Sequence, residues 1–112
     1  MSSIKQILTL EEIQTIISDE MAILVYFNTQ SCSVGEAFLP KVDGLIKKYF
    51  PKIKIFTVDL NISSEISAYY NAFVEPTILV FFDGKETIRK SRNFGMYELE
   101  DAIKRPYQLI FE

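Results

Sequence analysis

Cys32 is the only cysteine among the 112 residues, and its thiol is the one side chain placed where covalent chemistry could occur. It lies in residues 31–36, between an apolar run at residues 22–27 and a helical pattern. A cysteine at such a turn is a candidate nucleophile, because a helix N-terminus favours the ionised thiol that attacks disulfides. One cysteine excludes a disulfide within the chain, and the absence of histidine excludes a Ser-His or Cys-His catalytic pair. The chemistry to consider is thiol exchange with another molecule.

Composition limits the other classes of function. Length and an apolar fraction of 48% predict one domain that spans residues 1–112. A net charge of −3 argues against nucleic-acid binding, and the basic stretch at residues 89–92 is interpreted as a solvated strand end. No metal site is expected without histidine, and no cofactor fingerprint or phosphate loop is present. No apolar run is long enough to span a membrane and no secretory signal is visible, so we expect a cytoplasmic protein without a membrane partner.

Hydrophobic periodicity predicts the elements that position this turn. The expected strands are residues 22–27, 53–59, 77–82 and 86–91, with a short further strand at 4–8; the expected helices are residues 10–18, a segment from the Cys32 turn to about residue 49, a segment that opens at Ser63 or Ser64, and residues 96–105. Two crossover helices would join parallel strands, and an Asp83-Gly84 hairpin would close the sheet. The predicted fold class is a three-layer α/β domain with a mixed central sheet of four to five strands flanked by about four helices.

Several local signals refine these elements. Residues 9–12, Thr-Leu-Glu-Glu, have the form of a helix capping box. Pro40 should kink the helix that contains it, and Pro106 should end the last helix. The apolar residues 107–111 should either pack back on the sheet or cover a partner surface, including that of a second copy. The helix after Ser63 should place an apolar stripe against the core, formed by Ile62, Ile66, Tyr69, Tyr70 and Phe73.

Four features together resemble the thioredoxin family over nearly the whole chain. They are Leu24-Val25-Tyr26-Phe27 leading to Cys32, Pro40 eight residues after that cysteine, Val74-Glu75-Pro76-Thr77 opening a strand, and Phe82-Asp83-Gly84-Lys85 closing it. The resemblance implies a thioredoxin-like fold. It also implies that the Glu75–Pro76 bond is cis and that Pro76 faces the active-site cysteine across a substrate groove. An X-Pro bond can be held cis at little cost, about 0.5 to 1 kcal/mol.

The departures from the family pattern concern the chemistry. In the family motif, Cys-x-x-Cys, the second cysteine resolves the mixed disulfide formed at the first, whereas this chain has Gly35 at that position. Dithiol turnover is therefore excluded, and release needs an external thiol. Ser31 replaces the usual tryptophan, Tyr26 replaces a buried acid, and Glu36 replaces a basic residue. A carboxylate near the sulfur would oppose the effect of the helix N-terminus on thiol ionisation.

Residues 33–36 also match a capping box, Ser-x-x-Glu. If Ser33 is the N-cap, the helix starts one or two residues late and Cys32 lies just outside it. Gly35 would further weaken the first turn. On this interpretation the thiol is a weaker nucleophile than that of a working reductase.

Three hypotheses follow. The first is a monothiol disulfide-exchange protein in redox homeostasis, in which Cys32 reacts with protein or peptide thiols and disulfides, glutathione included. The second is a redox-inactive binding or adaptor module that keeps the groove beside Pro76. In the third, Cys32 is a small packing residue without a role. A homodimer is a further alternative, through the apolar tail or an oxidised Cys32. The residues expected to contact a substrate are Ser31, Ser33, Val34, Gly35, Glu75, Pro76 and Phe94.

Overall fold

The computed structural model describes residues 4–112 and contains a five-stranded mixed sheet with the strand order β1-β3-β2-β4-β5. The strands are β1 (Lys5–Gln6), β2 (Ala22–Asn28), β3 (Lys54–Asp59), β4 (Thr77–Phe82) and β5 (Lys85–Ser91). β3 runs parallel to β1 and β2, whereas β4 runs antiparallel to β2 and β5. α2 joins β2 to the parallel strand β3, and α1 joins β1 to β2, which run in the same direction. α3, in contrast, leads from β3 to a strand of opposite direction, β4, and the predicted closing hairpin joins β4 to β5.

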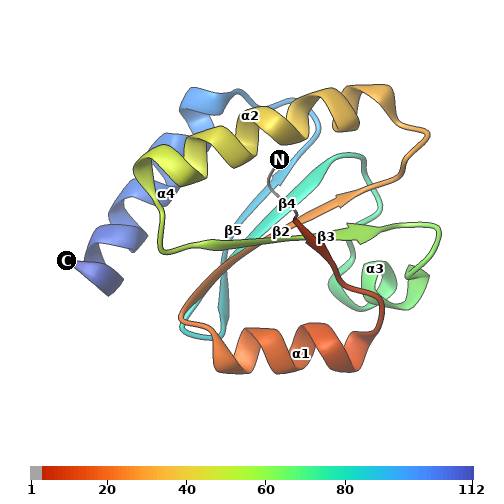
Figure 1. Ribbon diagram of the computed structural model, residues 1–112, viewed down its shortest axis with the longest axis horizontal. Helices are drawn as coiled ribbons and strands as arrows, with labels where there is room; N and C mark the ends of the chain where they lie inside the picture. Colours follow the sequence, from red (N-terminus) through yellow and green to blue (C-terminus); the bar gives the residue numbers. More distant parts are fainter. Residues whose placement is uncertain (1–3) are drawn as a thin grey trace.

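Four helices cover the two faces of the sheet (Figure 1). They are α1 (Leu10–Asp19), α2 (Ser33–Tyr49), α3 (Ser64–Tyr70) and α4 (Met96–Phe111). α2 and α4 pack on one face, and α1 and α3 lie on the other. This is the predicted three-layer architecture. None of the helices in residues 4–112 combines the length and hydropathy needed to cross a bilayer.

β2 is the central strand, and the position of Cys32 depends on it. All seven of its residues are buried, and their side chains alternate between two apolar clusters. Leu24 and Tyr26 point to the α2 side, while Val25 and Phe27 point to the α1 side. Burial on both faces explains the continuous apolar run in the sequence. The Cys32 turn therefore follows the central, fully buried strand of the sheet.

Two local predictions hold in atomic detail. Thr9 is the N-cap of α1, and its Oγ1 accepts the backbone N–H of Glu12 at 3.1 Å. The Glu12 carboxylate in turn accepts the backbone N–H of Leu8 at 3.0 Å. This hydrogen bond lowers the pKa of Glu12, and the hydrogen bond from the Lys5 side chain lowers it further. Asp83 and Gly84 both have positive φ, the conformation that a tight hairpin turn requires.

The predicted inward stripe on α3 is wrong for most of its members. Ile66 is buried and Tyr70 is half-buried, but Tyr69 is 59% and Phe73 is 64% exposed, and Ile62 is exposed as well. Length explains two of these positions: α3 has only seven residues, so Ile62 and Phe73 lie beyond its ends and do not continue its face. Tyr69 lies inside the helix, where its ring contacts the edge of Tyr70 and remains largely in solvent.

Pro106 does not end α4, which corrects a second prediction. The helix continues to Phe111 with Pro106 inside it. Packing accounts for the continuation: Tyr107 is buried against Phe50, with ring centroids 5.1 Å apart, and Phe111 stacks on Tyr107 at 4.8 Å. The Tyr107 hydroxyl also accepts the backbone N–H of Lys52 at 3.2 Å. These contacts hold the residues after Pro106 against the domain, so part of the apolar tail packs back on it.

Candidate functional site

Cys32 is the N-cap of α2, with extended backbone angles (φ −91°, ψ 96°). Its carbonyl accepts the backbone N–H of Glu36 at 3.0 Å, so Ser33 is already the first helical residue. The predicted shift of the cap to Ser33 is therefore wrong. The thiol makes no capping bond, and no side chain within residues 4–112 caps the first N–H groups of the helix. Cys32 is half-buried at the N-terminus of α2. The backbone N–H groups that follow it in the first helical turn receive no side-chain cap from the described residues.

The turn before Cys32 is fixed by Thr29. The backbone N–H of Cys32 donates to the Thr29 carbonyl at 3.2 Å. The Thr29 hydroxyl lies 3.1 Å from that of Ser31. Thr29 is itself only 5% exposed. Its buried position anchors an otherwise exposed loop.

Glu75 joins this turn to the proline loop across 46 residues of sequence. Its Oε1 accepts two hydrogen bonds from Thr29, one from the backbone N–H at 2.9 Å and one from the hydroxyl at 2.6 Å. The Glu75–Pro76 peptide bond is cis, and Pro76 is buried. The Cys32 turn and the proline loop are thus held together by the hydrogen bonds between Thr29 and Glu75.

A third loop packs beside them. The backbone N–H of Arg92 donates to the Pro76 carbonyl at 2.8 Å, and Arg92 adopts a positive φ of 53°. Phe94 lies edge-on against Phe38 of α2, with centroids 5.2 Å apart. Phe94 is therefore partly used for packing α2 and is not fully displayed to a partner.

Gly35 lies beneath the turn, against Asn28. A Cβ at position 35 would overlap the Asn28 side-chain amide, whose three terminal atoms are its nearest neighbours. Asn28 is 6% exposed, and its Nδ2 donates to the Thr29 carbonyl at 2.9 Å. The glycine is thus required by a close approach rather than merely tolerated. The position where a resolving cysteine would stand can hold a side chain only if Asn28 shifts.

Tyr26 supports the same turn from inside the core. Its hydroxyl donates to the Gly35 carbonyl at 2.6 Å. Burial raises the pKa of Tyr26, and the nearby charges of Cys32 and Glu36 raise it further. Tyr26 therefore remains a neutral hydrogen-bond donor at physiological pH, in the place where the resemblance implies a titratable acid.

Several side chains around Cys32 are exposed, both in the turn and beside the proline loop. Ser31 and Ser33 are exposed, and Val34 is 71% exposed. Phe73 and Val74, next to the proline loop, are exposed too. Cys32 is thus bordered by accessible apolar surface on the α2 side, and the proline loop carries more.

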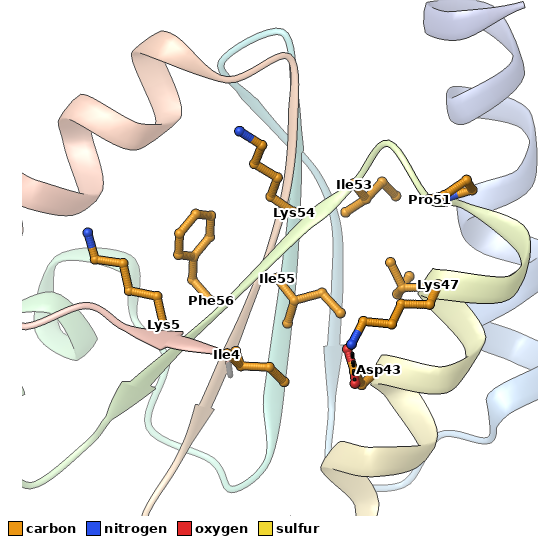
Figure 2. A pocket seen from close by; sticks show the side chains of 10 residues that line it. Ile4, Lys5, Asp43, Lys47, Pro51, Ile53, Lys54, Ile55 and Phe56 are labelled. Atoms are coloured by element: carbon orange, nitrogen blue, oxygen red, sulfur yellow. Dashed lines mark hydrogen bonds and ion pairs between the residues drawn. The ribbon is translucent and has the colours of Figure 1, made fainter. Parts of the chain in front are cut away.

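Two hollows open on the surface near α2. One, of about 280 Å³, lies behind the turn, and its lining includes Tyr26, Asn28 and Glu36. The other, of about 380 Å³, lies between the later part of α2 and the start of β3, away from Cys32 (Figure 2). Its lysines are all paired with carboxylates, as the Asp43–Lys47 ion pair at 3.0 Å illustrates. The second hollow therefore offers no free charge for a ligand.

Sequence reasoning missed the structural roles of Thr29 and Asn28 and the side-chain role of Glu75. Hydrophobic periodicity carries no information on a polar bond between positions 29 and 75. A signal existed for Asn28 only in that a polar residue ends an otherwise apolar strand. The structure brings Ser31, Cys32 and Glu75 together through Thr29, whereas Gly35 faces inward.

Comparison with known proteins gives a consistent result. The thioredoxin family model matches residues 5–105. A thioredoxin-like protein of Bacillus subtilis (strain 168), YdfQ, is 29% identical over 101 residues, which cover 90% of this chain and 89% of that protein. Mitochondrial thioredoxin 3 of Saccharomyces cerevisiae in its oxidised form superposes with a TM-score of 0.81 at 22% identity, covering 90% and 93% of the two chains. Fasciola hepatica thioredoxin gives 0.76 at 28% identity, covering 91% and 98%.

Proposed function

The chain belongs to the thioredoxin family, and from this premise we propose that it performs monothiol disulfide exchange through Cys32. The observation that carries the proposal is the position of that thiol. Cys32 is the N-cap of α2 and its side chain caps nothing, so the first N–H groups of the helix remain available to an anionic sulfur. A packing cysteine would not need this position.

The exchange takes place in two balanced steps. The Cys32 thiolate attacks one sulfur of a partner disulfide, a bond forms between them, and the partner's other sulfur leaves as a thiolate. An external thiol, such as glutathione, then attacks the partner's sulfur in the mixed disulfide, forms a new disulfide with it, and releases Cys32 as a thiolate. The proton of each attacking thiol passes to solvent. A reducing compartment such as the cytoplasm would supply the second thiol.

The test is to incubate the reduced protein with glutathione disulfide and follow its intact mass, together with the rate of thiol modification against pH. We expect one glutathione per chain, lost again on addition of excess reduced glutathione, and a rate above that of a free cysteine. Cys32→Ser should remain unmodified. A thiol no more reactive than free cysteine, with no adduct, would refute monothiol exchange. Nonreducing electrophoresis distinguishes the adduct from an oxidised dimer.

Accessible apolar surface supports a second candidate, a binding module. Val34, Phe73 and Val74 are exposed around the two loops, and an extended peptide with apolar side chains could lie against them. Capture of a partner should then survive in Cys32→Ser and be lost in Val34→Asp. If reducing agent releases the partner and Cys32→Ser captures none, exchange is the correct function and simple binding is not.

A further inference from the structure

We propose that Glu75 is a specificity-determining residue, which selects partners that carry a positive charge beside the reacting sulfur. The inference rests on the proposed exchange at Cys32 and adds a chemical class to it: disulfides and thiols flanked by lysine, arginine or an amine. Three features of Glu75 support this proposal: its carboxylate is held by hydrogen bonds from Thr29, it has no counter-ion within the described residues, and it is connected to Cys32 through Thr29.

The Glu75 carboxylate is fixed in place by neutral donors. Its Oε1 accepts both the Thr29 backbone N–H and the Thr29 hydroxyl, at 2.9 and 2.6 Å. Glu75 is only half-exposed and Thr29 is buried, so the acceptor does not sample solvent freely as a surface glutamate does. A preorganised charge of this kind can contribute to recognition without first losing side-chain entropy.

The same carboxylate has no counter-ion in the described chain. The ion pairs within residues 4–112 involve other acids, and none includes Glu75. Its Oε2 receives no hydrogen bond from any described residue, since both Thr29 bonds end on Oε1. Half-buried charges are normally paired, because partial loss of water disfavours the ion. A cationic partner group would supply the missing pair.

Glu75 is connected to the backbone of Cys32 by hydrogen bonds through one intervening residue, Thr29. Thr29 donates to the carboxylate, and the Thr29 carbonyl accepts the backbone N–H of Cys32. Glu36 is a second carboxylate, in the first turn of α2 directly after Cys32, and it has no ion pair within the described residues. Arg92 is the only cation in the three loops, residues 29–36, 73–76 and 92–95. The surroundings of Cys32 are thus net acidic, which attracts cations and repels anions.

The experiment measures how fast Cys32 reacts with three methanethiosulfonates of similar size, whose transferred groups carry an ammonium, no charge or a sulfonate. In each reaction the Cys32 thiolate forms a disulfide with the transferred sulfur, methanesulfinate leaves with the bonding electrons, and the thiol proton goes to solvent. In the wild-type protein at low ionic strength we expect the cationic reagent to react about tenfold faster than the anionic one, after correction for free cysteine.

Glu75→Gln removes the charge but keeps an oxygen that Thr29 can donate to. We expect this variant to lower the ratio of cationic to anionic rates about fivefold while the rate with the neutral reagent stays within twofold. Glu11→Gln is the matched control, since it makes the same change of net charge on the exposed face of α1. It should leave the ratio unchanged.

The outcomes are distinguishable. If Glu75→Gln folds and keeps the wild-type ratio, the role of Glu75 is refuted and the proposed exchange stands. If the neutral reagent reacts with wild-type Cys32 no faster than with free cysteine, the exchange and the inference both fail. Salt provides a test that needs no variant: the wild-type preference should fall steeply between about 10 mM and 1 M ionic strength. A preference that salt does not change would also refute the role of Glu75.

Discussion

α1 and α2 lie on opposite faces of the sheet, and they differ in how the free backbone N–H groups of their first turns are capped. At α1, Thr9 caps the helix and Glu12 closes the loop before it. At α2, the N-cap Cys32 leaves the first N–H groups without a side-chain acceptor, and the carboxylate of Glu36 lies toward Asn28 instead, 3.5 Å from its Nδ2. Each unmade cap costs about 1 kcal/mol of stability. The difference teaches that α2 gives up local stability at the point where a sulfur can use the free donors.

What holds the start of α2 in place lies beneath it. The Tyr26 hydroxyl bonds to the Gly35 carbonyl, and the Asn28 amide fills the space beside Gly35. α1 is stabilised by its own terminal residues, whereas α2 is stabilised by the strand below. Mutations can therefore separate the two mechanisms.

The largest effect is expected for Gly35→Ala. The new methyl group overlaps the Asn28 amide, so we expect a loss of about 2 kcal/mol in the free energy of unfolding, measured with urea. Gly44→Ala in the same helix is the control, because a Cβ at Gly44 meets nothing within 4 Å. That variant should gain about 0.5 to 1 kcal/mol from helix propensity. Equal effects at the two glycines would contradict the role assigned to Asn28.

Tyr26→Phe should cost about 1 kcal/mol at pH 7, because it removes the hydroxyl bond to Gly35. Its pH dependence has a defined sign. The pKa of Tyr26 is raised in the folded state, so its contribution is complete below the unfolded value of about 10 and declines as pH rises above it. The stability gap between the variant and the wild-type protein should therefore narrow above about pH 10. Burial also raises the pKa of Tyr70. Because Tyr70 is present in both proteins, its contribution cancels in the stability difference between them. A gap that widens would contradict this interpretation.

Thr9→Ala tests the capped end. Loss of the bond to the Glu12 backbone should lower stability by about 1 kcal/mol without changing the rate of Cys32 alkylation. Thr15→Ala, exposed inside α1, serves as the comparison and should change stability by less than about 0.5 kcal/mol. A change in Cys32 reactivity on loss of Thr9 would show that the two helix ends are coupled.

The smallest effect is expected for Cys32→Ser, which gives α2 the kind of cap that α1 has. The hydroxyl can accept an N–H of the first turn, so stability should rise by about 0.5 kcal/mol while thiol chemistry is lost. Chemical denaturation under reducing conditions measures the gain. A decrease in stability would indicate that the half-buried sulfur contributes more by packing than the missing cap costs.

The sequence predicts most of the fold because the relevant signals are local. The buried run of β2, the Thr9 capping box and the Asp83-Gly84 turn each lie within a few residues, and the structure has all three. The failures arise where tertiary contacts decide. Pro106 remains helical because Tyr107 is anchored on Phe50.

In the site, too, local features could be predicted from the sequence, whereas contacts between distant residues could not. The position of Cys32 at a strand-to-helix turn is visible in the sequence, but its cap is not. A Ser-x-x-Glu pattern predicts Ser33 as the cap, whereas the Cys32 carbonyl takes the first helical bond. The Glu75–Thr29 pair joins positions 46 residues apart, and one sequence offers no pattern for such a pair.

The contact between Gly35 and Asn28 also affects which sequences this chain can reach by mutation. A single substitution that placed a second cysteine at position 35 would put its Cβ into the buried Asn28 amide. The Asn28 side chain would have to shift to admit it, so we expect Gly35→Cys alone to be less stable than the wild-type protein. We therefore expect a two-thiol form of this domain to need a compensating change at position 28.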